Sequence, residues 1–145
     1  VEEDAPIKLD QKQNYLSEIE YTVRKINKIL AGDEIAIVAV AEDKVVADAS
    51  IIRDMGRQHD VGELGIAISN GYRNIGLGYE IIRLLLEMAK AENYRIIKLE
   101  VYANNPAARH LYEKLGFVEA GKLPKAAVFK GEYVDSILMY KELYP

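Results

Sequence analysis

The most informative stretch of this chain reads YRNIGLG, from Tyr72 to Gly78, and it leads directly into a helical pattern. Apolar residues recur there at Ile81, Ile82 and Leu85, which is the spacing of one helix face. Glycines let a backbone approach an anion closely, and a helix N-terminus carries about half a positive charge. The stretch therefore predicts a pyrophosphate site, with a plain glycine turn before a helix as the open alternative.

Two common nucleotide-binding motifs do not fit this stretch. A dinucleotide fingerprint needs a third glycine three residues after Gly78, where the chain has Ile81. A P-loop needs a Gly-Lys-Ser or Gly-Lys-Thr string, and the sequence contains neither. A pyrophosphate at this turn would therefore belong to a different cofactor.

A second stretch, from Leu99 to Phe117, reads as a strand, a helix cap, a short helix and a stop. Asn105 is a natural N-cap, and Pro106 suits the first helical position, because its missing N–H would have no partner there. Gly116 fits the left-handed residue that ends a helix. Between these ends runs one apolar face, formed by Ala108, Leu111, Tyr112 and Leu115.

Together the two stretches resemble the GNAT superfamily of acetyl-CoA-dependent N-acetyltransferases. The resemblance covers the chain from about Ile35 to the C-terminus. It implies acetyl-CoA as cosubstrate, no metal, and a primary amine that attacks directly in a ternary complex. The matching residues are Arg73-x-x-Gly76-x-Gly78 and Asn105-x-x-Ala108-x-x-Leu111-Tyr112-Glu113-Lys114-x-Gly116-Phe117.

Apolar periodicity predicts the element order α-βββ-α-β-α-ββ, hence a mixed α/β sheet, in a single domain spanning residues 1–145. The resemblance implies that these elements form the GNAT-like acyl-CoA N-acyltransferase fold. A helix from Leu16 to Leu30 should end at Gly32. The later elements are a hairpin of strands 35–41 and 45–53, a loop at 54–60, a strand at 62–69, a helix at 77–93, a strand at 96–102, a helix at 106–115, a strand at 117–122, a loop through 131 and a strand at about 135–141.

The N-terminal part departs from the family pattern. Relatives begin with a strand and usually two helices before the first hairpin, whereas the 34 residues before Ile35 hold one helical pattern. We therefore expect a first strand and helix to be missing. In relatives that region shapes the acceptor pocket, so the identity of the acceptor stays open.

The resemblance also implies which residues bind the cofactor. In relatives the strand before the glycine turn pairs with the pantetheine arm through its backbone, which by position corresponds to Ile66, Ala67 and Ile68. Asn105 corresponds to an asparagine that contacts the cofactor arm, although a helix cap alone also explains it. The residues that would hold the pyrophosphate are Arg73, Asn74, Ile75, Gly76, Leu77 and Gly78.

Two further residues are implied to act in catalysis. Tyr112 corresponds to a family tyrosine near the thioester sulfur, and Glu100 stands where the protein N-terminal acetyltransferases carry a base. Without the resemblance, Tyr112 would read as core and Glu100 as an exposed strand residue. An alkylamine is almost wholly protonated at neutral pH, so some group must accept its proton. Glu63 and Glu113 are weaker candidates for that base.

Composition excludes several chemistries. The chain has no cysteine, which excludes disulfides, thiolate metal sites and a cysteine acyl-enzyme, and its two histidines, His59 and His110, do not suggest a metal site. The net charge of −4 argues against nucleic acid and favours a cationic acceptor. The longest apolar run, at 35–41, is too short to span a membrane, and the acidic start does not resemble a signal peptide. We expect a cytoplasmic protein without a membrane partner.

The sequence leaves the substrate branch open. The end of the chain resembles enzymes that acetylate amino acids and other small amines, whereas the second stretch fits the protein-directed branch, which acetylates N-termini or lysines, equally well. Tyr102 and Tyr133 are candidates for lining an acceptor site. A non-catalytic acyl-CoA-binding regulatory or interaction module is the alternative function, although Tyr112 argues against it. A homodimer is also left open.

Overall fold

The computed structural model describes residue 23 and residues 25–144, which fall into two compact units, residues 1–33 and 34–145. In the first unit, residues 25–30 are helical and Gly32 follows with a φ of 80°, as expected for a glycine that ends a helix. Most of the predicted first helix, from Leu16 onward, lies outside the described residues.

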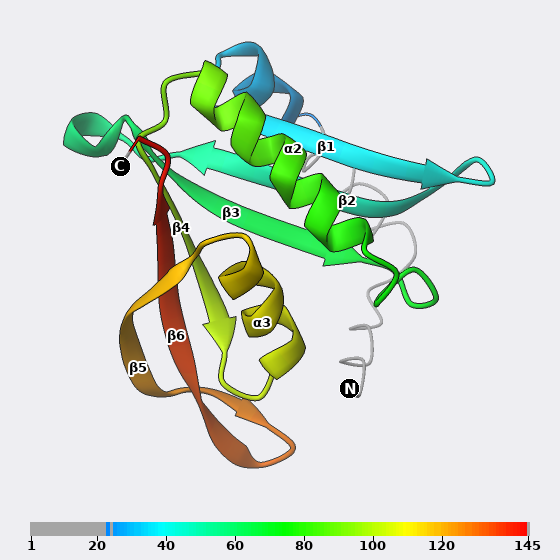
Figure 1. Ribbon diagram of the computed structural model, residues 1–145, viewed down its shortest axis with the longest axis vertical. Coiled ribbons are helices and arrows are strands. Elements are labelled where there is room, and N and C mark those ends of the chain that lie inside the picture. Colours follow the sequence, from blue (N-terminus) through cyan, green and yellow to red (C-terminus); the bar gives the residue numbers. More distant parts are fainter. Residues whose placement is uncertain (1–22, 24, 145) are drawn as a thin grey trace. The chain divides into compact units, whose positions relative to one another are not determined.

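A six-stranded sheet with the spatial order β1-β2-β3-β4-β6-β5 forms the second unit (Figure 1). β3 and β4 are parallel, and every other neighbouring pair is antiparallel. This arrangement confirms the predicted mixed α/β sheet. The elements are β1 (Glu34–Ala41), β2 (Lys44–Arg53), the 3-10 helix η1 (Gly56–Gln58), β3 (Val61–Ile68), α2 (Leu77–Ala91), β4 (Ile96–Tyr102), α3 (Pro106–Lys114), β5 (Val118–Phe129) and β6 (Glu132–Glu142).

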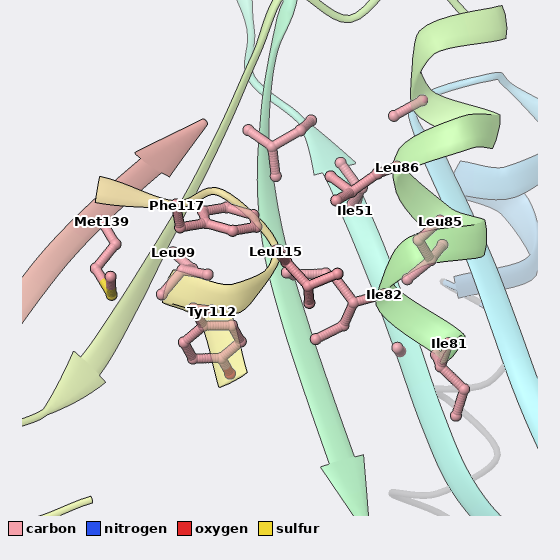
Figure 2. Packing of buried hydrophobic residues seen from close by; sticks show 14 of the residues in the cluster. Ile51, Ile81, Ile82, Leu85, Leu86, Leu99, Tyr112, Leu115, Phe117 and Met139 are labelled. Carbon is pink, nitrogen blue, oxygen red and sulfur yellow. The ribbon is translucent and has the colours of Figure 1, made fainter. Parts of the chain in front are cut away.

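The core lies between one face of the sheet and the helices α2 and α3 (Figure 2). Successive strand side chains point to opposite faces, so Ile51 and Leu99 enter the core while Glu100 stays exposed on the other face. Ile82 and Leu85 of α2 are fully buried against the sheet. Burial of each such side chain stabilises the fold by about 1.5–3 kcal/mol.

Packing and an ion pair hold β3 and β4 together where both strands begin. A Cβ at Gly62 would lie 2.7 Å from Cε1 of the buried Tyr94 ring, so a side chain there would collide with the tyrosine. Arg95 Nε donates to Asp60 Oδ2 at 2.8 Å. This hydrogen bond lowers the pKa of Asp60 below its ordinary value of 3.8. The two residues join the segments that lead into the paired strands.

The predicted loop at 123–131 is wrong, because β5 continues to Phe129 and β6 starts at Glu132, earlier than expected. Pro124 indicates a break, but β5 is an edge strand, where a missing N–H need not cost a ladder bond. The ladder with β6 is irregular around Pro124 and resumes after it. A turn at 130–131, with positive φ at both residues, closes the hairpin.

Candidate functional site

The parallel strands β3 and β4 pair at one end only. Their ladder joins Val61–Glu63 to Ile96–Lys98. Beyond it, within the part of the chain that the structure describes, β3 pairs only with β2, and β4 only with β6. Figure 1 shows the two strands diverging. We call the unpaired segments that face each other, residues 64–68 and 99–102, the splay.

Hydrogen bonds to β2 determine which backbone groups of β3 face the splay. The Ser69 N–H donates to the Val46 carbonyl at 2.8 Å, and the Asp54 N–H donates to the Val61 carbonyl at 2.8 Å. Bonded and non-bonded pairs alternate along an antiparallel ladder, and the β2–β3 register is regular between these two bonds. The odd-numbered residues of β3 therefore bond to β2, and the even-numbered residues turn their amide groups toward the splay.

By this alternation Ile66 and Ile68 present their N–H groups to the splay, whereas Ala67 presents its N–H to β2. Both isoleucine side chains are half-buried and pack against the core. The Ile68 carbonyl accepts a hydrogen bond from Arg73 Nε at 2.8 Å. An extended chain that adds to a strand needs such outward N–H groups, and Ile66 and Ile68 supply them.

The glycine turn leaves the start of α2 open. Gly76 is the N-cap residue with a φ of 84°, and Asn74 has a φ of 60°. The N–H groups of a helix's first turn have no intrahelical partner, and Gly76 has no side chain that could cap them. A Cβ at Gly76 would meet no atom within 4 Å among the described residues, its chain neighbours aside. The turn thus offers a helix N-terminus with free space beside it, as an anion requires.

Gly78 has a packing role that the motif does not reveal. A Cβ there would lie 3.2 Å from both Ile68 Cδ1 and Leu111 Cδ2. The missing side chain therefore lets the start of α2 pack closely on β3 and α3. Of the other turn residues, Arg73, Asn74 and Ile75 are exposed, and Leu77 is half-buried against the core.

Asn105 caps α3 as the sequence predicted. Its Oδ1 accepts a hydrogen bond from the Ala108 N–H at 3.1 Å, and Pro106 occupies the first helical position. The bond uses only the oxygen of the side-chain amide. The cap therefore accounts for the residue structurally and leaves its NH₂ group for a second contact.

The C-terminal end of α3 fixes the position of Tyr112. The Phe117 N–H donates to the Tyr112 carbonyl at 3.0 Å, and the Gly116 N–H donates to the Glu113 carbonyl at 3.0 Å. Gly116 has a φ of 90°, which completes a Schellman motif and confirms the predicted helix end. The rings of Tyr112 and Phe117 pack edge to face with centroids 6.0 Å apart.

Tyr112 is 8% exposed, and in Figure 2 it is seen, on the helix side of the sheet, over the space between the diverging strands β3 and β4. Its hydroxyl points away from Leu99 and Phe117. Burial raises the pKa of the phenol above its ordinary value of 10.0. The hydroxyl therefore stays protonated and can donate a hydrogen bond throughout the neutral pH range.

Glu100 lies on the opposite face of the sheet. Its neighbours Leu99 and Val101 are buried toward the helices, so the Glu100 side chain points away from them and is exposed. Ser136 of β6 donates from Oγ to Glu100 Oε2 at 3.0 Å. Local sequence patterns do not reveal Ser136, because its place beside Glu100 depends on the register between β4 and β6.

The weaker candidates for the base and Tyr102 lie on three different elements, β3, α3 and β4. Glu63 is exposed on β3, and Glu113 is an exposed helix residue whose Oε1 accepts a hydrogen bond from Arg109 Nε at 3.1 Å. Tyr102 packs edge to face on Phe129, with ring centroids 5.2 Å apart. Tyr102 belongs to the splay, and Glu63 directly precedes it on β3.

The two histidines, His59 and His110, are exposed, as is Tyr133. Among the described residues, no three His, Cys, Asp or Glu side chains are grouped so that they could hold a metal ion. In the same part of the chain no helix has the length and apolar character needed to cross a membrane.

Comparison with known proteins shows the family. Residues 4–117 match the profile of the Acetyltransferase (GNAT) family. The uncharacterized N-acetyltransferase YokL, derived from prophage SPbeta of Bacillus subtilis, is 32% identical over 114 residues, which are 77% of this chain and 64% of that protein. The L-amino acid N-acetyltransferase AaaT of Escherichia coli is 32% identical over 107 residues, which are 71% of this chain and 65% of that protein.

The chain thus spans just under two thirds of the length of these two curated relatives. A crystal structure of a GNAT-family acetyltransferase from Streptococcus pneumoniae has a similar fold, with a TM-score of 0.72 and 32% identity. The similarity covers 77% of this chain and 68% of that one.

The cap on α3 generates a stability prediction. Asn105→Ala should lower the free energy of unfolding by about 1 kcal/mol, because the Ala108 N–H loses its acceptor. Asn104→Ala, at the exposed neighbouring position, is the matched control and should change it by less than about 0.5 kcal/mol. Urea unfolding followed by circular dichroism measures both values. Equal losses in the two variants would contradict the capping assignment.

Proposed function

The chain belongs to the acetyltransferase (GNAT) family, and we propose that it transfers an acetyl group from acetyl-CoA to a primary amine by direct attack in a ternary complex. The observation that carries this proposal is the splay between β3 and β4. Tyr112 lies at the splay on the helix side of the sheet, and Glu100 lies on the opposite side. A thioester held within the splay would be reached by an amine from one face and by the tyrosine hydroxyl from the other.

The residues present fit the parts of acetyl-CoA. The open first turn of α2 and the exposed Arg73 would hold the pyrophosphate, because both offer N–H donors and positive charge. The N–H groups of Ile66 and Ile68 would pair with the pantetheine arm. The amide of Ala67 faces β2, so we assign it no direct contact. Asn74, Ile75, Gly76, Leu77 and Gly78 would act through the turn and its packing, and Asn105 through its side-chain NH₂ group.

Acetyl-CoA supplies the acetyl group as an activated thioester. Glu100 would accept the proton of the attacking amine, because an alkylamine with a pKa of about 10.4 is neutral in only about one molecule in 2,500 at pH 7. A strand N–H near Ile66 would donate to the carbonyl oxygen as negative charge develops there.

Tyr112 would donate a hydrogen bond to the departing sulfur. A thiol has an ordinary pKa of about 8.5, whereas burial raises the pKa of Tyr112 above 10.0. Full transfer of the phenol proton to the thiolate is therefore uphill by more than about 2 kcal/mol. The hydroxyl would stabilise the developing charge first, with proton transfer late or concerted.

The acceptor is a small amine, an amino acid, a protein N-terminus or a lysine. An amino acid has support from AaaT, whose name gives L-amino acids as its substrates. Four further points stay predictions: a cytoplasmic location, a homodimer, the lack of nucleic-acid and membrane partners, and a single domain over residues 1–145.

An acceptor screen tests the proposed function. With acetyl-CoA and a panel of polyamines, amino acids and N-terminal peptides, one class of amine should be acetylated with release of CoA. Because the chain has no cysteine, its intact mass after mixing with acetyl-CoA alone should show no stoichiometric acetyl-enzyme. Binding of CoA without transfer to any amine would support the non-catalytic module instead. A chemically competent acetyl-enzyme would overturn the ternary complex.

The two catalytic roles predict different pH dependence. Glu100→Gln removes the proton acceptor, so its loss of rate should be largest near neutral pH and should shrink as the pH approaches the pKa of the amine. Tyr112→Phe deletes a hydrogen-bond donor to the sulfur, and a higher pH cannot replace that donor. Turnover should therefore fall by roughly 10²- to 10⁴-fold across the pH range. Affinity for CoA should change little.

Rate profiles against pH, with folding checked by circular dichroism, measure both variants on one acceptor. Glu63→Gln, which removes the other exposed carboxylate near the splay, is measured beside them. A larger loss in Glu63→Gln than in Glu100→Gln would move the base to β3. Near-normal turnover in a folded Tyr112→Phe variant would leave Tyr112 as a core residue only.

A further inference from the structure

A buried hydroxyl on β6 contacts the candidate base. Ser136 is 4% exposed, and its Oγ donates to Glu100 Oε2 at 3.0 Å. The register between β4 and β6 places Tyr102 opposite Ser136, so Ser136 and Glu100 are diagonal neighbours on one face of the sheet. A buried hydroxyl without a hydrogen-bond partner destabilises the folded state, so this contact also satisfies Ser136 itself.

We propose that Ser136 is a positioning residue, which holds the Glu100 carboxylate in place for proton transfer; this inference rests on the proposed function. An exposed glutamate side chain samples many rotamers. A hydrogen bond from a residue within the sheet restricts them and engages Oε2. Oε1 of Glu100 is then left to accept the proton that the ammonium form of the acceptor loses before its nitrogen attacks the acetyl carbon. The carbon–sulfur bond of the thioester then breaks, and CoA leaves as the thiolate.

The nearby charged side chains, Lys98 and Glu63, do not hold the Glu100 carboxylate in place. Lys98, on the same strand and face, has its Nζ 2.7 Å from Asp54 Oδ2 and is thereby paired. Glu63 lies opposite Lys98 in the β3–β4 ladder and is exposed. Among the described residues, it is Ser136 that donates a side-chain hydrogen bond to Glu100.

A double-mutant cycle of Ser136→Ala and Glu100→Gln tests the inference on the best acceptor of the screen. Glutamine keeps an oxygen that can accept from Ser136, so the fold is preserved. In the wild-type background Ser136→Ala should lower kcat about 10-fold at neutral pH, with an unchanged KM for acetyl-CoA. In the Glu100→Gln background it should change kcat by less than about 2-fold. The defect should shrink at higher pH, where the amine needs the base less.

Matched variants separate positioning from packing. Ser136→Thr keeps the hydroxyl and should retain activity, and Ser136→Cys, of similar volume with a weak donor, should repeat the loss even if Ser136→Ala does not fold. Ser50→Ala, at a half-buried serine of β2, should have wild-type activity.

The outcomes distinguish this inference from the proposed function. An equal loss in both backgrounds, or a loss that threonine does not rescue, would make Ser136 a purely structural residue. Normal kcat in Ser136→Ala, with an active wild-type protein, would overturn the inference and leave acetyl transfer intact. Failure of the wild-type protein to acetylate any amine would refute the proposed function itself.

Discussion

Parallel pairing between β3 and β4 covers only three residue pairs, and the candidate site depends on where it stops. At the paired end, Tyr94 packs where Gly62 has no side chain, and the Asp60–Arg95 ion pair joins the segments that lead into the strands. At the other end, Tyr112 of α3 lies on the helix side of the sheet, and in Figure 2 it is seen over the space between the strands. Packing and an ion pair thus fix the paired end of the two strands, from which the splay opens.

The separation of the strands places two ionisable groups in different surroundings. Tyr112 is buried, and desolvation keeps it protonated as a donor. Glu100 is exposed on the other face, where an amine can reach it from solvent, and Ser136 restrains its carboxylate. Proton transfer in two directions requires a protonated donor and a separate acceptor, which Tyr112 and Glu100 can supply from opposite faces. The sheet itself therefore divides the proposed chemistry between its faces.

Sequence patterns predicted those parts of the site that local forces build. The cap at Asn105 depends on residues within one helical turn, so its spacing alone was enough. Strand pairing is not local. The sequence alone does not tell which of the Ile66 and Ala67 N–H groups bonds to β2 and which faces the splay, because that depends on the register with β2. Ser136 stayed hidden for the same reason. The loop predicted at 123–131 is wrong for a similar reason: nothing local in the sequence shows that β5 is an edge strand, where Pro124 is tolerated.

Amide hydrogen exchange along β3 tests the role of the splay most directly. NMR of the full chain, with and without saturating CoA, measures the N–H groups of Ile66, Ala67 and Ile68 separately. If the pantetheine arm adds to β3 as a strand, exchange at Ile66 and Ile68 should slow by at least about 10-fold, while Ala67, already bonded to β2, should not change. CoA binding that shifts the turn at Gly76 but leaves Ile66 and Ile68 unprotected would contradict this account.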